Sequence, residues 1–318
     1  MSDQSASFEI RPLRHSDFPR YRPVVLLAAG ELERSTGIDA RAEATIDLLN
    51  RRSIWFLLGL TRLFGRPIVD TLVATTGNDI QGTGTILWFP KSAYVAGVAT
   101  KPEWRGRGVA SAILGRLEAL ARRRRREWML LDVESGNEPA VRVYQKSGYR
   151  VTDTFTWLAS TGLPPARPVT ADGARRVGAS EWPELTALLD ASRPADYRAA
   201  FPARKRVLHH NEVMVRGGRT ESATWWRRTD AGAAVVVRAY FVPGARMGAF
   251  FPMSTLPEPR AEEFSGILAA AVDWVRSRNP QRCLAVAPEP RGGIAASLEQ
   301  LGFTGGISSA VMVRPVSR

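Results

Sequence analysis

Cysteine is almost absent from this 318-residue chain, and long apolar runs are missing. The single cysteine, Cys283, excludes an intramolecular disulfide framework and a cysteine-based zinc site. The longest apolar run, Ile54 to Leu60, is far shorter than the roughly 18 residues that span a bilayer, so no transmembrane segment is expected. The stretch from Met1 to Ser7 is polar, and no secretory signal peptide is expected there. A cytoplasmic location is therefore the expectation.

Lysine is also scarce, so arginine carries most of the positive charge. The formal net charge is +13, and the only lysines are Lys91, Lys101, Lys146 and Lys205. This arginine bias, together with abundant alanine, glycine and valine, suggests a bacterial protein from a GC-rich genome. A strongly basic chain attracts phosphorylated cofactors, nucleic acid, acidic membrane surfaces or acidic partners, and the charge alone does not choose among them.

Length and composition indicate two globular domains, and the alternation of expected strands and helices along the chain gives the α/β class. The hydrophobic fraction of 44% and the charged fraction of 24% are typical of soluble globular proteins. A chain of 318 residues is comfortable for two domains of roughly 150 residues each. Proline and glycine concentrate between Thr161 and Pro168, which favours a linker there. We expect a first domain at 1–160, a linker at 161–167 and a second domain at 168–318.

Hydrophobic periodicity predicts most of the elements. Strands are expected at Phe8–Leu13, Val69–Thr75, Gly84–Phe89, Ala93–Thr100, Arg150–Leu158, Glu221–Arg227, Ala233–Phe241, Met247–Met253 and Arg282–Ala287. Helices are expected up to about Glu33, starting late because of Pro19 and Pro23, and at Glu181–Leu189, Ala261–Arg276 and Ile294–Leu301. Ala40 to Phe64 reads either as a core helix that walls a pocket or as a basic amphipathic segment on a membrane or partner.

The second half of the chain repeats the first in a degenerate form. The run Pro102 to Arg105 aligns with Pro257 to Arg260, and Gly148-Tyr149 aligns with Gly302-Phe303 at nearly the same spacing. The residues between these anchors differ in chemistry: Gly106, Arg107 and Gly108 become Ala261, Glu262 and Glu263, and Tyr144 becomes Leu298. Two carboxylates would repel a phosphate, so the second copy is expected to keep the fold without the chemistry.

The turn from Arg105 to Ala110 has the pattern R-x-x-G-x-A and lies between an expected strand and an expected helix. Glycines at 106 and 108 let the backbone approach a ligand closely. The free N–H groups of the first helical turn then point at any anion bound there. This context predicts a phosphate-binding turn.

The stretch from Tyr94 to Tyr149 resembles the core of the GNAT acyltransferases, which transfer an acetyl group from acetyl-CoA to an amine. The matching motifs are R-G-R-G-V-A and V-E-S-G-N-E-P-A-V-R-V-Y-Q-K-S-G-Y. The resemblance covers roughly 8–158 well and 168–318 as a degenerate copy. It implies two GNAT-like domains in tandem, each a mixed, twisted β-sheet flanked by helices.

The resemblance also implies where acetyl-CoA binds. Val98 and Thr100, on a splayed fourth strand, would offer backbone groups to the pantetheine arm and the acetyl carbonyl. Asn137, the Glu138-Pro139 pair and Ala140 would lie along the pantetheine, with the Asn137 amide as its nearest contact. The pyrophosphate would be held by the backbone amides of Arg105, Gly106, Arg107, Gly108, Val109 and Ala110.

Tyr144 matches the tyrosine that members of this family place near the CoA sulfur. A phenol of pKa about 10 stays protonated at neutral pH and can protonate a departing thiolate, whose thiol pKa is about 8.5. The alternative is a core tyrosine whose hydroxyl is bonded elsewhere. An amine of pKa near 10 must lose a proton before attack, and Asp132 is the candidate base, against a merely polar strand residue. Glu134 and Glu103 are rivals for that role.

These expectations point to an N-acetyltransferase that uses acetyl-CoA and a primary amine of a small molecule or peptide, without a metal. A direct attack in a ternary complex is expected, because the lone Cys283 lies in the other half of the chain. The competing interpretation is a CoA-binding sensor or partner-binding module without turnover. No DNA partner is expected, and a homodimer is left open.

The five consecutive arginines from Arg122 to Arg126 also permit two interpretations. A solvated helix C-terminus is stabilised by cations, whereas clustered arginines can also bind RNA or the ribosome. The adjacent His209 and His210 lack a neighbouring cysteine or carboxylate cluster and make a poor metal site.

Overall fold

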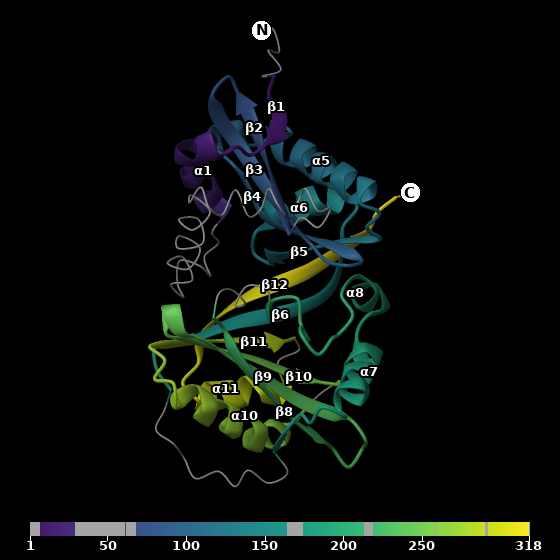
Figure 1. Ribbon diagram of the computed structural model, residues 1–318, viewed down its shortest axis with the longest axis vertical. Coiled ribbons are helices and arrows are strands. Elements are labelled where there is room, and N and C mark those ends of the chain that lie inside the picture. Colours follow the sequence, from purple (N-terminus) through teal and green to yellow (C-terminus); the bar gives the residue numbers. More distant parts are fainter. Residues whose placement is uncertain are drawn as a thin grey trace. The chain divides into compact units, whose positions relative to one another are not determined.

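The computed structural model describes residues 7–28, 61, 68–163, 174–212, 219–257, 259–289 and 292–317. Two compact units are present (Figure 1): unit 1 is Met1–Val151 with Val311–Arg318, and unit 2 is Thr152–Ala310. The expected boundary at 160 stays a prediction, because the units interleave along the chain. Apart from Thr61, the predicted helix at Ala40–Phe64 lies outside the described residues, as does most of the linker.

Unit 1 is a mixed sheet with helices on both faces, in the order β1(Glu9–Pro12), α1(Phe18–Val25), β2(Val69–Thr76), β3(Asp79–Trp88), β4(Ser92–Thr100), α5(Val109–Arg123), β5(Trp128–Glu134) and α6(Glu138–Lys146). Strands β1 to β4 pair antiparallel in sequence order, and β4 pairs with β5 in parallel. The strand next to β5 in the sheet is β12(Thr304–Pro315), the last strand of the chain. The carboxyl-terminal residues therefore complete unit 1.

Glycines on β3 let helix α5 lie close to the sheet. A Cβ atom at Gly84 would come within 2.6 Å of Ile113, and one at Gly82 within 2.7 Å of Val109. The alternate residues of β3 face the other side, where Thr83 and Thr85 contact the buried Tyr21 of α1. Successive strand residues point to opposite faces, so the two helices cover opposite sides of unit 1.

Strand β4 separates from β5 halfway along its length. The parallel pairing between them covers only Ser92 to Tyr94, opposite Trp128 to Leu130. Beyond Tyr94, Gly97 adopts φ of +59° where the register with β3 shifts, which is a bulge that bends the strand. The ends of β4 and β5 are thereby left unpaired with each other, and α5 begins beside this opening. The predicted splay of the fourth strand is present.

Unit 2 is built in the same order as unit 1 and has its own core. Its elements are β6(Arg150–Ser160), β7(Arg175–Arg176), α7(Trp182–Ser192), α8(Ala195–Ala200), β8(Glu221–Arg228), β9(Ala234–Val242), β10(Met247–Ser254), α10(Ala261–Arg276), β11(Arg282–Pro288), α11(Gly292–Gln300) and β12. The strand order is β12-β6-β11-β10-β9-β8-β7. The buried β9 packs with the apolar face of α10, which places the core under the centre of this sheet.

The predicted repeat is confirmed by this order of elements. The series β2-β3-β4-α5-β5-α6-β6 recurs as β8-β9-β10-α10-β11-α11-β12. Both predicted second anchors adopt the same left-handed conformation, with φ of +83° at Gly148 and +78° at Gly302. The protein thus consists of two α/β domains, each a mixed β-sheet flanked by helices. The final strand of each repeat does not stay with its own copy: β6 from Thr152 onward belongs to unit 2, and β12 from Val311 onward belongs to unit 1.

Two local expectations were wrong. Helix α1 starts at Phe18, directly after a short 3-10 turn, so the prolines do not delay it. Pro19 takes an early position where no N–H is needed, and Pro23 lies inside the helix two residues before its end. Strand β3 begins at Asp79 rather than Gly84, because the two-residue turn at Gly77 and Asn78 forms a tight hairpin.

Candidate active site

The phosphate-binding turn has the predicted backbone geometry. Gly106 and Gly108 adopt φ of +74° and +78°, the left-handed region that favours glycine. A Cβ atom at either position would meet nothing within 4 Å. Gly108 is the N-cap of α5 without any side-chain cap. In the part of the chain that the structure describes, no side chain or carbonyl closes off the amides from Gly106 to Ala110, and they remain open to an anion.

The basic side chains of the turn are exposed, which suits contacts with a charged ligand. Arg105 and Arg107 both face solvent, and the Arg107 guanidinium lies 5.2 Å from the centre of the Trp104 ring. Glu103 is exposed in the 3-10 turn before them. Glu103 therefore lies on the approach to the turn.

The end of β4 carries an unsatisfied polar group beside the turn. The Thr100 hydroxyl is buried and has no hydrogen-bond partner among the described residues. Val98 is half-buried, and its side chain lies near the position where a Cβ of Gly84 would be. A buried hydroxyl without a partner costs about 1–3 kcal/mol, which a hydrogen bond to a ligand would offset.

Asn137 has a structural function that the sequence did not reveal. Its side-chain oxygen accepts a hydrogen bond from the Ala140 amide at 3.2 Å, which makes Asn137 the N-cap of α6. The carboxamide is exposed. The cap uses the oxygen of Asn137, and its NH2 group is the part that a pantetheine contact would use.

Tyr144 is buried, but its hydroxyl is not bonded elsewhere within the described residues. The side chain is 8% exposed on α6 and forms an edge contact with Tyr149, with 6.0 Å between ring centres. Burial raises the pKa of Tyr144 to about 12. The phenol is therefore fully protonated at neutral pH, and no hydrogen bond to a described residue occupies it.

Asp132 lies on β5, two residues beyond the last pair with β4, at the opening between the strands. Its Oδ2 accepts a hydrogen bond from the hydroxyl of Tyr94 at 3.1 Å. The rival Glu134 is the last residue of β5, and its carbonyl accepts the Asn137 amide. Tyr94 was not among the predicted site residues, although its place on β4 opposite β5 could have indicated it.

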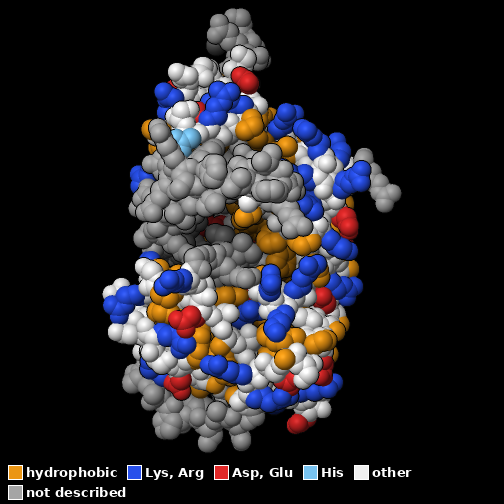
Figure 2. Space-filling view, in the orientation of Figure 1, with side chains coloured by type: hydrophobic (Ala, Val, Ile, Leu, Met, Phe, Trp, Pro, Cys, Tyr) orange, Lys and Arg blue, Asp and Glu red, His pale blue; other side chains and the backbone are white. Residues whose placement is uncertain are grey.

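The side chains of the arginine run mainly bind neighbouring elements of unit 1 and so hold the end of α5 in place. Arg124 pairs with Asp70 at 3.1 Å and lies over the Trp88 ring, and Arg126 donates to the Pro90 carbonyl at 2.7 Å. Arg122 donates to the Ser317 carbonyl at 2.9 Å. These contacts favour the interpretation as a helix end. On the face shown in Figure 2, lysine and arginine side chains are scattered rather than gathered in one patch.

In unit 2 the start of α10, which corresponds to the phosphate-binding turn of unit 1, is occupied by protein atoms. The Glu263 carboxylate accepts a hydrogen bond from the Arg260 amide at 2.9 Å and so caps the helix. The first residues of α11 pack onto the same end, because a Cβ atom at Gly293 would lie 2.1 Å from the Ala261 nitrogen. The expected loss of the phosphate site in the second copy agrees with this geometry.

The carboxyl terminus contributes contacts to unit 1 that the sequence did not indicate. Arg314 donates to Glu118 of α5 at 2.8 Å and to the Ser147 carbonyl, and its guanidinium lies 5.8 Å from the Tyr149 ring centre. The two hydrogen-bond partners are 196 and 167 residues away in sequence, so local patterns carry no signal for them. Within the described ranges, no helix is long and apolar enough to cross a membrane, and no cluster of three metal-ligating side chains occurs.

Comparisons with known proteins show what this chain is similar to. Residues 40–149 match the model of the Acetyltransferase (GNAT) family. The L-amino acid N-acetyltransferase AaaT of Escherichia coli is 35% identical over 102 residues, which cover 29% of this chain and 60% of that enzyme. The chain thus matches less than two thirds of this relative's length.

Two solved structures resemble the whole chain. A tandem GNAT protein from the clavulanic acid biosynthesis pathway shares 16% identity, with 98% of this chain and 99% of that one covered and a TM-score of 0.55. A GCN5-related N-acetyltransferase from Sphaerobacter thermophilus shares 14% identity, and the match covers 100% of this chain and 98% of that one with a TM-score of 0.59. Residues 40–149 thus resemble the Acetyltransferase (GNAT) family, and the chain as a whole shares the fold of tandem GNAT proteins, with two such domains in one chain.

Proposed function

We propose that unit 1 is an acetyl-CoA-dependent N-acetyltransferase that modifies a primary amine by direct attack in a ternary complex. The observation that carries the proposal is the set of open amides from Gly106 to Ala110 at the start of α5, beside the opening between β4 and β5. This arrangement suits a pyrophosphate on the helix end and an extended arm between the strands.

The residues present fit the co-substrate. Gly106 and Gly108 leave open space where any other side chain would stand, and the buried Thr100 hydroxyl is available to a ligand. When bound, acetyl-CoA would supply an activated thioester. The amides of residues 106–110 would hold the phosphates, and the ends of β4 and α6 would orient the arm. The Arg105 amide, which was also predicted to contribute, already donates to the Pro102 carbonyl at 3.2 Å.

Two proton movements are assigned to side chains of unit 1. Asp132 takes the proton that the ammonium group must lose, either directly or through water. Tyr144 gives its proton to the departing sulfur, for which its burial and its raised pKa keep it protonated. The hydrogen bond from Tyr94 positions Asp132. The ring contact with Tyr149 positions Tyr144, so each group has its own neighbour.

The acceptor is proposed to be a small primary amine, with a peptide amine as the other class. The name of the Escherichia coli relative states L-amino acids as its acceptors, and that match spans 29% of this chain. Amino acids therefore head the panel of amines to be tested, followed by polyamines, aminoglycosides and peptides. A cytoplasmic location and a homodimer stay predictions.

The test is to replace Tyr144 by phenylalanine in the full chain. Loss of the proton donor should lower kcat by about 100-fold or more, while the Kd for CoA changes less than about twofold. Tyr149→Phe is the matched control, because it removes a neighbouring hydroxyl that bonds only weakly to Met129 Sδ at 3.8 Å. This control should keep kcat within about threefold.

A CoA-binding sensor without turnover, the alternative, predicts a different result in the acetyl-transfer assay. CoA binding with no acetyl transfer to any amine of the panel would support the sensor and contradict the enzyme. Turnover that is equally fast in Tyr144→Phe would contradict the assigned proton donor while leaving acetyl transfer intact.

A further inference from the structure

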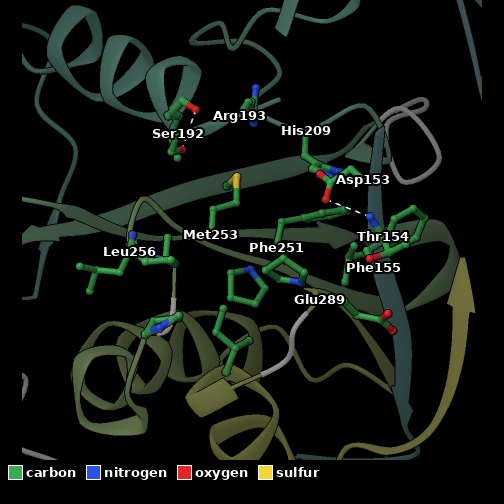
Figure 3. A pocket seen from close by; sticks show the side chains of 18 of the residues that line it. Asp153, Thr154, Phe155, Ser192, Arg193, His209, Phe251, Met253, Leu256 and Glu289 are labelled. Atoms are coloured by element: carbon green, nitrogen blue, oxygen red, sulfur yellow. Dashed lines mark hydrogen bonds between the residues drawn. The ribbon is translucent and has the colours of Figure 1, made fainter. Parts of the chain in front are cut away.

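Unit 2 contains a cavity of about 180 Å³ that no acetyl-transfer step uses. It lies between the ends of β10 and β11, the start of β6, the carboxyl end of α7 and the turn at His209. Its polar lining includes Asp153, Arg193, His209 and Glu289. Figure 3 shows Asp153 and His209 on one side of the view, Leu256 on the other, and Phe251 and Met253 between them.

The cavity occupies the part of unit 2 that corresponds to the β4–β5 opening of unit 1, but it lacks a phosphate site. Glu263 and the packed start of α11 close the end of α10, as described above. Glu262 adds a second carboxylate at that helix start. A nucleotide phosphate has no place there, so the occupant of the cavity belongs to another chemical class.

The cavity lining carries more negative than positive charge. Asp153 and Glu289 are carboxylates, whereas Arg193 is the single cation of the lining. Arg193 is 9% exposed and already engaged, since it pairs with Asp190 at 3.4 Å and donates to the Leu208 carbonyl. Arg193 is thus shared between Asp190 and the nearby Asp153, and the lining keeps an excess of negative charge.

Asp153 is the group that most needs a cation. Its Oδ1 accepts the Thr154 amide at 2.9 Å, and its Oδ2 forms no hydrogen bond with a described residue. Burial raises the pKa of this carboxyl group by more than the Thr154 amide, His210 and Arg193 lower it, so the nearby cation does not fully compensate the buried charge. Glu289 is better satisfied, because it accepts a hydrogen bond from the Thr156 hydroxyl. A cation beside Asp153 would remove the cost of burying an unpaired charge.

The remaining walls suit an organic rather than an inorganic cation. Phe155, Tyr197 and Phe251 present aromatic rings, and cations bind favourably to ring faces. His209 adds a neutral ring, because burial lowers its pKa well below the ordinary value. A water molecule fills about 10–15 Å³ of such a volume, so 180 Å³ accommodates a ligand of about a dozen non-hydrogen atoms.

We propose that this cavity binds a small organic ammonium ion, with its nitrogen at Asp153 and its apolar body on the aromatic rings and Met253. Unit 2 is then a separate ligand-binding domain. Its ligand is an organic ammonium ion, whereas the phosphate site that would suit a nucleotide has been lost. This inference does not depend on acetyl transfer by unit 1.

The ligands of the test share one body and differ in charge. Isothermal titration of the full chain, without CoA, compares 2-phenylethylamine, 2-phenylethanol and 3-phenylpropionate. The amine should bind saturably, the alcohol at least tenfold more weakly, and the carboxylate not at all. Equal affinity for amine and alcohol, or preference for the carboxylate, would overturn the proposal.

Variants locate the site. Asp153→Asn should weaken the amine at least tenfold, while Glu262→Gln, which removes an exposed carboxylate of unit 2 outside the cavity, should change affinity less than twofold. Ser192→Trp, at an exposed position of the lining, should block binding sterically and serves if the first variant does not fold. Amine binding that survives both substitutions, or that is abolished by Gly108→Ala in unit 1, would assign the amine to another site.

Discussion

Arg314 should determine the stability of unit 1 although it lies four residues from the carboxyl end of the chain. We predict that Arg314→Ala lowers the free energy of unfolding of unit 1 by about 2 kcal/mol. The lost hydrogen bond to the Glu118 carboxylate is worth about 1.5–3 kcal/mol, and the contact over Tyr149 adds about 0.5–1 kcal/mol. Arg122 and Ser317 still contact Glu118, which keeps the loss toward the lower end.

Hydrogen exchange followed by mass spectrometry checks this prediction, because it reports each unit separately. If exchange proceeds through opening of unit 1, a loss of about 2 kcal/mol raises the rates about 30-fold in peptides of α5, β5 and α6. Peptides of β9 and α10 in unit 2 should keep their rates. Arg228→Ala is the matched control: its pair with Glu184 is exposed, at 58% and 45%, and should contribute under about 1 kcal/mol. Faster exchange confined to unit 2, or unchanged exchange in unit 1, would refute the assignment of the carboxyl terminus.

Other substitutions test single contacts. Gly84→Ala should cost about 1–3 kcal/mol in thermal unfolding, since its Cβ would lie 2.6 Å from an α5 side chain. Gly106→Ala meets open space, so it should cost only about 1 kcal/mol of stability for its left-handed φ but weaken CoA binding in titration. Glu212→Gln should cost about 3 kcal/mol or more, because it leaves the buried Arg238, 3.5 Å away, without its partner charge. Burial raises the pKa of Cys283 to about 12, so thiol reagents at pH 8 should label it only after denaturation, and fast native labelling would contradict its burial.

Local chemistry made much of the fold predictable. The helix from Ala261 to Arg276 has the predicted ends, because an amphipathic period runs between a capping Glu263 and a basic last turn. The hairpin at Gly77 follows from turn residues whose conformations few other residues adopt. The repeat was visible because the left-handed glycines at 148 and 302 serve the same turn in both copies.

Long-range pairing was beyond sequence reasoning. Strand β6 pairs with β11 rather than staying in unit 1, yet its apolar residues fit either sheet. The last strand, β12, went unpredicted altogether. The cavity of unit 2 was equally hidden, because Asp153, Arg193 and Glu289 are far apart in sequence and none belongs to a motif. Asn137 shows a subtler limit: the residue was selected for a ligand contact, while its oxygen also satisfies a backbone amide.

The two repeats differ in how they satisfy the free amides at the start of the corresponding helix, and this difference supports the proposed function. Every helix begins with amides that lack an internal partner, and satisfying them stabilises the helix by about 1 kcal/mol. Unit 2 satisfies the amide of the N-cap residue, Arg260, with its own Glu263 carboxylate. Unit 1 places left-handed glycines before the same helix and leaves the amides open, although a side-chain cap would have stabilised the fold. Unit 1 gives up this stabilisation and unit 2 keeps it, a difference that supports the proposal that the amides of unit 1 bind a ligand.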